Sequence, residues 1–132
     1  MESDSSLTVL VIDDSQVARA KMSQLLTGAG IRVHTLPSPI GATRAILANN
    51  VDVVVVDVMM PGMRGDRLAA LFRSNPRFDK LGVILVSGAA EHELHELCLE
   101  TKADATLAKS RLAELVPMVR KLSEKLQGGG DA

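Results

Sequence analysis

The sequence predicts one α/β domain built on a doubly wound, five-stranded parallel sheet, with five helices covering its two faces. Two observations lead to this prediction. Short apolar runs alternate with amphipathic stretches along the 132 residues, of which 46% are hydrophobic. Moreover, three of the apolar runs are continuous rather than alternating. This pattern is typical of strands that are buried on both faces in a parallel sheet.

The five expected strands fall into two groups. Continuous apolar runs at Leu7–Ile12, Val53–Asp57 and Gly82–Val86 predict strands in the interior of the sheet. Ile31–Thr35 and Ala105–Ala108 are weaker patterns, so we expect these two strands at the edges. The connections between the parallel strands should be right-handed crossovers.

The first two helices are expected after the first two strands. Gln16–Thr27 carries an apolar stripe, and Gly28 and Gly30 follow it with the conformational freedom that ends many helices. Ser38 has the side chain of a helix N-cap, and Pro39 suits the first helical position. We therefore expect the second helix to begin at this pair.

The remaining helices are expected at Asp66–Ser74, Ala90–Thr101 and roughly Leu112–Leu126. In the first of these three, the apolar spacing predicts that Leu68, Leu71 and Phe72 are buried. The last one contains Pro117, which lacks a backbone donor and clashes with a preceding helical turn. Either the regular helix begins near Pro117 or it is kinked there, and the sequence leaves both possibilities open.

Composition and charge exclude several classes of protein. The net charge of −1 and the absence of Trp and Tyr argue against nucleic acid or an anionic membrane as the main partner. No apolar run reaches the ~18 residues of a membrane helix, and the polar start MESDSS does not resemble a secretory signal. The single Cys98 excludes an internal disulfide. We expect a soluble cytoplasmic domain at residues 1–126, followed by a flexible Gly-rich tail at 127–132.

Polar residues stand where four of the expected strands end. Asp13 and Asp14 follow the first strand, Asp57 ends the third, Ser87 follows the fourth and Lys109 follows the fifth. Ligands of open parallel sheets bind at the carboxyl ends of the strands, so these side chains should converge. Taken singly, each has an ordinary explanation as a helix cap, a turn residue or a solvated charge.

The chemistry of this set indicates a metal and a phosphoryl group. Three neighbouring carboxylates repel one another, and a divalent cation relieves that repulsion. Oxygen ligands without His or Cys favour Mg²⁺ or Mn²⁺ over zinc. Asp57, on a rigid strand end, is a candidate nucleophile for phosphoryl transfer. Lys109 would neutralise one phosphoryl oxygen, and the Ser87 hydroxyl would donate to another.

Four stretches, VLVIDDSQVAR, VVVVDVMMPGMRG, VILVSGAA and ATLAKS, together resemble the receiver domain of bacterial two-component response regulators. The resemblance covers about residues 7–126 and implies a flavodoxin-like sheet with strand order 2-1-3-4-5, as in the chemotaxis receiver. It implies that Asp57 is the phosphoacceptor and that Ser87 and Lys109 hold the phosphoryl group. The implied Mg²⁺ ligands are Asp13 (through water), Asp14, Asp57 and the backbone carbonyl of Met59.

The resemblance also implies the partners. A sensor histidine kinase or a phosphotransfer protein would dock near the first helix and donate the phosphoryl group. A downstream protein, or an output domain missing from this sequence, would contact the face formed by the fourth helix, the fifth strand and the fifth helix. The chain would catalyse only its own phosphorylation and dephosphorylation.

Several positions depart from the family pattern. Thr106 replaces an aromatic residue, and Ser110 replaces a proline that is often cis, so a trans bond is expected after Lys109. Met59 and Ala89 stand where family members often carry polar groups that orient the hydrolytic water. We therefore expect slow self-dephosphorylation.

Two other functions are compatible with parts of this pattern. A phosphorylation-independent interaction module of receiver fold would explain Thr106 and Ser110, although the complete acidic set with Lys109 argues against it. A haloacid-dehalogenase-type phosphatase also uses an aspartate at a strand end. That class carries a second acid two residues later, where this chain has Met59.

Overall fold

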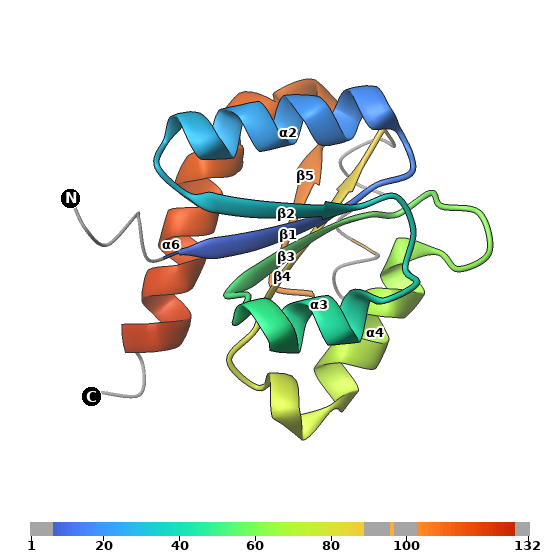
Figure 1. The fold of residues 1–132 in the computed structure, drawn as a ribbon, viewed down its shortest axis with the longest axis vertical. Helices are drawn as coiled ribbons and strands as arrows, with labels where there is room; N and C mark the ends of the chain where they lie inside the picture. Colours follow the sequence, from blue (N-terminus) through green and yellow to red (C-terminus); the bar gives the residue numbers. More distant parts are fainter. Residues whose placement is uncertain (1–6, 89–95, 97–102, 129–132) are drawn as a thin grey trace.

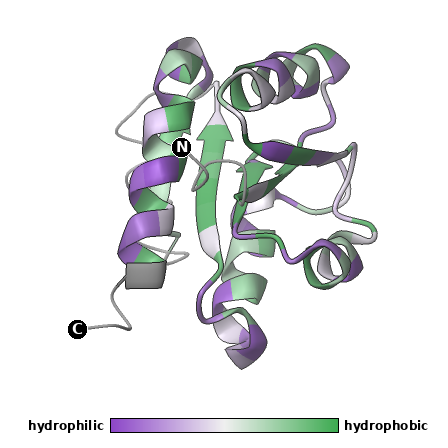
Figure 2. Cartoon of the chain, turned by 60° about the vertical axis from the view of Figure 1, so that its left-hand side comes forward, coloured by the Kyte–Doolittle hydropathy of each residue, from purple (hydrophilic) through white to green (hydrophobic). Residues whose placement is uncertain are grey.

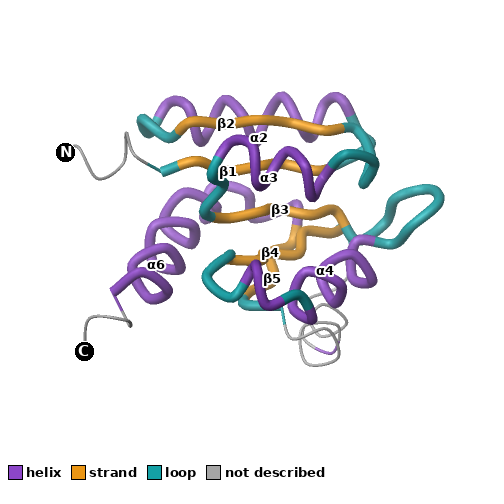
Figure 3. The backbone as a smooth tube through the Cα atoms, turned by 60° about the horizontal axis from the view of Figure 1, so that its bottom comes forward, coloured by secondary structure: helices purple, strands orange, loops and turns teal. Residues whose placement is uncertain are grey.

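Five parallel strands form the centre of the fold (Figure 1). The computed structural model describes residues 7–88, 96 and 103–128. Within these ranges the strands are β1 (Thr8–Ile12), β2 (Arg32–Leu36), β3 (Val53–Asp57), β4 (Gly82–Ser87) and β5 (Ala105–Ala108). They pair in the order β2-β1-β3-β4-β5, which Figure 3 shows from another side. The predicted doubly wound sheet and its order are confirmed.

The burial of the strands follows their order in the sheet. Every residue of β1, β3 and β4 is buried, whereas β2 is exposed or half-buried along its whole length. Figure 2 shows hydrophobic strands in the middle of the fold and helices in which hydrophobic and hydrophilic residues alternate. The continuous apolar runs therefore do mark the interior strands, and the weaker runs mark the two edges.

Within the described ranges, two α-helices cover each face of the sheet. On one face lie α2 (Gln16–Gly28) and α6 (Leu115–Gly128), and on the other lie α3 (Ala42–Asn49) and α4 (Gly65–Ser74) (Figure 1). Two short 3-10 helices, η1 (Pro76–Phe78) and η2 (Lys109–Glu114), precede β4 and α6. The helix expected at Ala90–Thr101 lies outside the described residues. None of the helices in the described ranges is long and apolar enough to span a membrane.

The helix α2 begins at the predicted residue, Gln16, and ends at Gly28, one residue after the predicted end. Its N-cap is Ser15, whose side-chain Oγ accepts a hydrogen bond from the Ala18 N–H at 3.2 Å. Its last residue is Gly28, and Gly30 follows with a left-handed φ of 86°. The chain can therefore turn directly into β2.

The predicted start of the second helix is wrong. The helix α3 begins at Ala42, behind Gly41, which has a left-handed φ of 84°. The side chain of Ser38 instead accepts a hydrogen bond from the Ile40 N–H at 3.3 Å. Ser38 and Pro39 therefore belong to a turn, and the left-handed conformation that precedes the helix is one that glycine adopts readily.

The burial predicted for Leu71 is also wrong. Leu68 and Phe72 are buried as expected, but the Leu71 side chain is 50% exposed and Ala69 is buried instead. Gly65, Leu68, Ala69 and Phe72 form the stripe that faces the sheet. Leu71 lies at the flank of that stripe, on a side of α4 that does not face the sheet, so it remains in solvent.

The structure decides between the two possibilities for Pro117. The chain first forms η2, in which Arg111 has a non-helical backbone (φ −121°, ψ 31°), and the regular helix α6 begins at Leu115. Pro117 is thus the third residue of α6. Backbone N–H groups in the first helical turn have no intrahelical partner, so the missing donor of Pro117 costs no hydrogen bond there.

Candidate functional site

Three carboxylates meet at the carboxyl edge of the sheet. The strands β1 and β3 are neighbours, with Ile12 opposite Val56, so the residues after them emerge side by side. One carboxylate oxygen from each of Asp13, Asp14 and Asp57 lies within 4.8 Å of the other two. Asp13 and Asp57 are buried, whereas Asp14 is exposed. The structure therefore brings together the three acids that follow these two strands.

The backbone and side chain of Asp13 are held by several hydrogen bonds. Its N–H donates to the Leu36 carbonyl at 3.2 Å, and its Oδ1 accepts from the Ser15 N–H at 2.8 Å. Its own carbonyl accepts from Nη1 of Arg19 at 2.7 Å. The contact of Arg19 with Asp13 could not be predicted from the sequence, because nothing in the helical pattern distinguishes Arg19 from a surface arginine.

The ammonium group of Lys109 lies between two of the acids. Its Nζ is 2.9 Å from Oδ2 of Asp13 and 3.5 Å from Oδ1 of Asp57. Burial lowers the pKa of Lys109, but the contacts with Asp13 and Asp57 outweigh burial, and the pKa lies above its ordinary value of 10.5. Lys109 is therefore a firmly charged counterion for two buried carboxylates.

The electrostatic environment of Asp57 differs from that of an ordinary surface carboxylate. Burial and the nearby Asp13 raise the pKa of Asp57 from 3.8 to about 6, against the opposing effects of Lys109 and of the Met59 N–H. That N–H donates to Oδ1 of Asp57 at 3.3 Å. Near neutral pH the group is thus largely ionised, yet more basic than a solvated aspartate.

Ser87 and Met59 flank the phosphoacceptor candidate. In the pairing of β3 with β4, Asp57 lies opposite Val86, so Ser87 is one residue further along the same edge. Ser87 is buried and lies opposite Ala108, the residue before Lys109. The Met59 side chain, in contrast, is 61% exposed at the mouth of the site.

A glycine allows α4 to pack against the backbone of Asp57. A Cβ atom on Gly65 would lie 2.0 Å from the Asp57 carbonyl oxygen, so no side chain fits there. The Gly65 N–H donates to the Val58 carbonyl at 2.9 Å and fixes the start of α4. The sequence contains this glycine in PGMRG, but its long-range contact could not be read from the local pattern.

The acid cluster fits a divalent cation. Oδ2 of Asp13 is buried and makes no hydrogen bond of suitable geometry in the described part of the chain, although the Lys109 ammonium is 2.9 Å away. That contact is therefore ionic, and the oxygen keeps lone pairs available to a ligand. Three oxygen donors without nitrogen or sulfur are the type of set that hard cations such as Mg²⁺ prefer.

Two of the unusual positions lie on or next to β5. Thr106 is half-buried and pairs with Leu85 of β4. The peptide bonds in the described ranges, including the one between Lys109 and Ser110, are free of cis geometry. The expected trans bond is confirmed, and η2 begins directly at Lys109.

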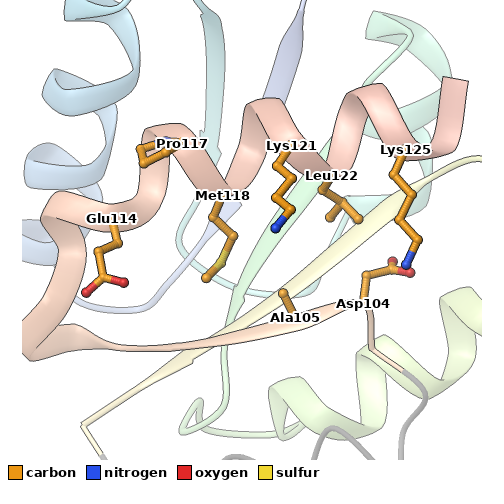
Figure 4. Close-up of a pocket in the computed structure, with 8 residues that line it drawn as sticks. All are labelled: Asp104, Ala105, Glu114, Pro117, Met118, Lys121, Leu122 and Lys125. Carbon is orange, nitrogen blue, oxygen red and sulfur yellow. The ribbon is translucent and has the colours of Figure 1, made fainter. Parts of the chain in front are cut away.

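A separate groove of about 420 Å³ lies between β5 and α6 (Figure 4). Met118 and Leu122 extend from α6 toward Ala105 of β5 (Figure 4). Lys121 and Lys125 add two amines to its lining. Its lining also includes Asp104, which precedes β5, and Glu114, which ends η2, but none of the three acids at the carboxyl edge of the sheet.

Comparisons with known proteins identify the family to which the chain belongs. The response regulator receiver domain family matches residues 9–120. The two-component response regulator ORR6 of Oryza sativa subsp. japonica is 32% identical over 114 residues, which cover 82% of this chain and 65% of that protein. The chain spans between 11% and 65% of the length of the curated relatives that it matches.

Solved structures show the same fold. A putative response regulator from Chloroflexus aurantiacus J-10-fl has a TM-score of 0.80 at 27% identity, covering 89% of this chain and 97% of that one. The response regulator protein TrrA from Thermotoga maritima, in complex with Mg²⁺-BeF, has a TM-score of 0.76 at 28% identity, covering 88% and 98%. Because the family match extends over most of the sequence, the chain belongs to the response regulator receiver domains of two-component signalling.

Proposed function

We propose that this chain is a phosphorylation-dependent signalling switch in which Asp57 accepts the phosphoryl group. The observation that carries the proposal is the position of Asp57: a buried carboxylate at a strand end, 3.5 Å from a lysine ammonium and clustered with two further acids. Receiver domains take phosphoryl groups from histidine kinases and connect to output domains, and the residues of this site supply the chemistry that such a transfer needs.

Asp57 is suited to act as the nucleophile. With a pKa raised to about 6, the carboxylate is about 90% ionised at pH 7 and remains more basic than an ordinary aspartate. One of its oxygens would attack the phosphorus of the donor in line, and the bond to the donor's leaving group would break as the new O–P bond forms. The rigid end of β3 holds this nucleophile in place.

Asp13, Asp14 and Asp57, together with the Met59 carbonyl, would hold Mg²⁺, and Asp13 would act through water. When bound, the ion neutralises charge on the phosphoryl oxygens. TrrA, which is similar to this chain over nearly its whole length, was solved with Mg²⁺-BeF. Oδ2 of Asp13 is buried and has an ionic contact with Lys109 but no hydrogen bond in the described part of the chain, so it could still accept one from a metal-bound water.

Lys109 and Ser87 would hold the transferred group. The ammonium already lies 3.5 Å from Oδ1 of Asp57, so it is within reach of a phosphoryl oxygen attached to that carboxylate. Ser87 stands at the end of β4, between the ends of β3 and β5, where its hydroxyl could donate to a second oxygen. The contacts of Lys109 and Ser87 with phosphoryl oxygens would exist only in the phosphorylated state. They would therefore favour an arrangement of the end of β4 that differs from the one in the unphosphorylated chain.

The partners follow from the same site. The donor would be a sensor histidine kinase or a phosphotransfer protein that docks near α2, beside the acids. The output partner would be a downstream protein or an output domain that contacts β5, α6 and the segment 90–101. The groove between β5 and α6, with Met118 and Leu122 in its lining and two lysines beside them, supports this choice of face.

Phosphotransfer from acetyl phosphate tests the proposal. The wild-type chain should gain the mass of one phosphoryl group when Mg²⁺ is present, and Asp57→Asn should gain none. Asp79→Asn is a matched control, because it removes an exposed carboxylate that follows η1, at the amino end of β4. If Asp57→Asn and the wild type are labelled alike, Asp57 is not the acceptor.

The alternative function is a phosphorylation-independent interaction module of the same fold. Thr106 in β5 favours it, because no aromatic ring is present there to change its orientation. Beryllofluoride with Mg²⁺ separates the two functions. A switch shows amide chemical-shift changes beyond the acid cluster, in β5 and α6, whereas a static module shows none there.

A further inference from the structure

Arg19 connects the first turn of α2 to the acid cluster. The helix begins at Gln16, and Arg19 is therefore its fourth residue. Its half-buried side chain turns back toward the sheet, and Nη1 donates to the Asp13 backbone carbonyl at 2.7 Å. A short hydrogen bond from a charged guanidinium is among the stronger kinds in proteins.

The position of this arginine is unfavourable for the helix itself. A cation near the N-terminus of a helix is repelled by the positive end of the helix dipole. The first turn of α2 contains no acidic residue to offset that repulsion. The guanidinium is thus better explained by the carbonyl that it contacts than by any benefit to α2.

That carbonyl belongs to the peptide group that joins Asp13 to Asp14. The amide and the carboxylate of Asp13 are already held by Leu36 and Ser15. Fixing the carbonyl as well sets the orientation of the peptide plane, and hence the direction in which Asp14 leaves the backbone. Asp14 is exposed, so it lacks the packing that holds the other two acids in place.

We propose that Arg19 is a positioning residue of the metal site, which directs the Asp14 carboxylate toward a cation shared with Asp13 and Asp57. The inference rests on the proposed function, because the cation is the one required for phosphoryl transfer. In this inference the Arg19 side chain contacts neither the metal nor the phosphoryl group, and it acts through its hydrogen bond to the backbone of Asp13.

Positioning and simple electrostatics predict opposite effects. If Arg19 acted only through its charge, removing it would relieve repulsion of the metal and tighten Mg²⁺ binding. If Arg19 positions Asp14, removing it weakens Mg²⁺ binding although a positive charge has been lost. The sign of the change therefore separates the two roles.

The test compares two arginines that both donate to a backbone carbonyl at an end of α2. Arg19 contacts Asp13 before the helix, and Arg120 of α6 contacts the carbonyl of Ala29 just after it, with Nη2 at 3.4 Å. Mg²⁺ binding to the full chain is measured by titration calorimetry for the wild type, Arg19→Met and Arg120→Met. Urea unfolding of each variant reports the loss of stability separately. We expect Arg19→Met to weaken Mg²⁺ binding by about tenfold and Arg120→Met to leave it unchanged.

Several results would overturn the inference. Mg²⁺ binding by Arg19→Met that is equal to or tighter than that of the wild type rejects positioning, and so does equal weakening in both variants. If Arg19→Met does not fold, Arg19→Lys replaces it: a weaker but clear loss supports the inference, and wild-type affinity rejects it. A wild-type chain that binds no Mg²⁺ rejects the proposed site itself, a result distinct from unaltered binding by the Arg19 variants alone.

Discussion

Replacing Asp57 by asparagine should make the metal-free protein more stable near neutral pH. The pKa of Asp57 rises from 3.8, its value in an unfolded chain, to about 6 in the folded protein, so the folded protein binds the proton more tightly. The folded state is therefore most favoured while Asp57 is protonated, and stability falls as the pH rises from about 4 to about 6. Asparagine is neutral and of similar size, so the variant does not experience this loss.

The expected difference follows from the two pKa values. From 3.8 and about 6, the ionised Asp57 costs ~0.5 kcal/mol at pH 4, ~1.6 kcal/mol at pH 5 and ~3 kcal/mol at pH 7. Asp57→Asn should exceed the wild type by similar amounts in free energy of unfolding. The measurement is urea unfolding at each pH, with EDTA present, because a bound cation would stabilise the wild type selectively. Far-UV circular dichroism is the suitable signal, since the chain has no Trp and no Tyr.

The pH dependence is the decisive part of this measurement. Asp79→Asn, which removes an exposed carboxylate, should follow the wild type across the range. If the difference between Asp57→Asn and the wild type is the same at pH 4 and pH 7, burial and Asp13 are not the source of the effect. If Asp57→Asn is less stable than the wild type at pH 7, the attraction between Lys109 and the Asp57 carboxylate outweighs the unfavourable effects of burial and of Asp13.

Three further predictions concern the surroundings of the site. Gly65→Ala should lower the free energy of unfolding in urea by about 3 kcal/mol or more, because the new Cβ would collide with the Asp57 backbone. Gly28→Ala is the control: this position in α2 has open space around it, so the substitution should raise the free energy of unfolding by ~0.5–1 kcal/mol. Equal effects of the two substitutions would contradict the packing argument. Without metal at pH 7, Lys109→Met should lower the free energy of unfolding by about 1–3 kcal/mol, because two buried carboxylates lose their counterion. Saturating Mg²⁺ should recover most of this loss. A loss that Mg²⁺ does not change would indicate an effect of packing instead. Met59→Asn should shorten the lifetime of the phosphorylated chain by about tenfold, because the asparagine at this exposed position would add one hydrogen bond to the attacking water. The lifetime is followed by intact mass after acetyl phosphate is removed. An unchanged or longer lifetime would contradict the prediction that Met59 slows dephosphorylation.

Local patterns in the sequence were sufficient for the sheet and for the position of the acids. The limits of Val53–Asp57 are the same in the prediction and in the structure, because a strand buried on both faces needs an uninterrupted apolar run. Asp13, Asp14 and Asp57 meet because parallel strands end at one edge. These features depend on periodicity and topology, which a single sequence carries.

Features that depend on contacts between distant residues could not be predicted in this way. One miss was local: Ser38 and Pro39 have the residue types of a helix start, but they form a turn, and the helix begins at Ala42 after the left-handed Gly41. The exposure of Leu71 depends on which side of α4 faces the sheet, and that side carries Gly65, which packs against the Asp57 backbone. Similarly, nothing local shows that Arg19 reaches back to Asp13.

The close approach of Gly65 to Asp57 has a practical consequence for engineering the lifetime of the signal. At Gly65, where α4 packs against the Asp57 backbone, there is no room for even one additional carbon atom. At the opening, Met59 faces solvent and can be exchanged for side chains of different size and polarity. Designed timers built on this domain should therefore be tuned at the solvent-facing rim, while the wall behind the acceptor is left as it is.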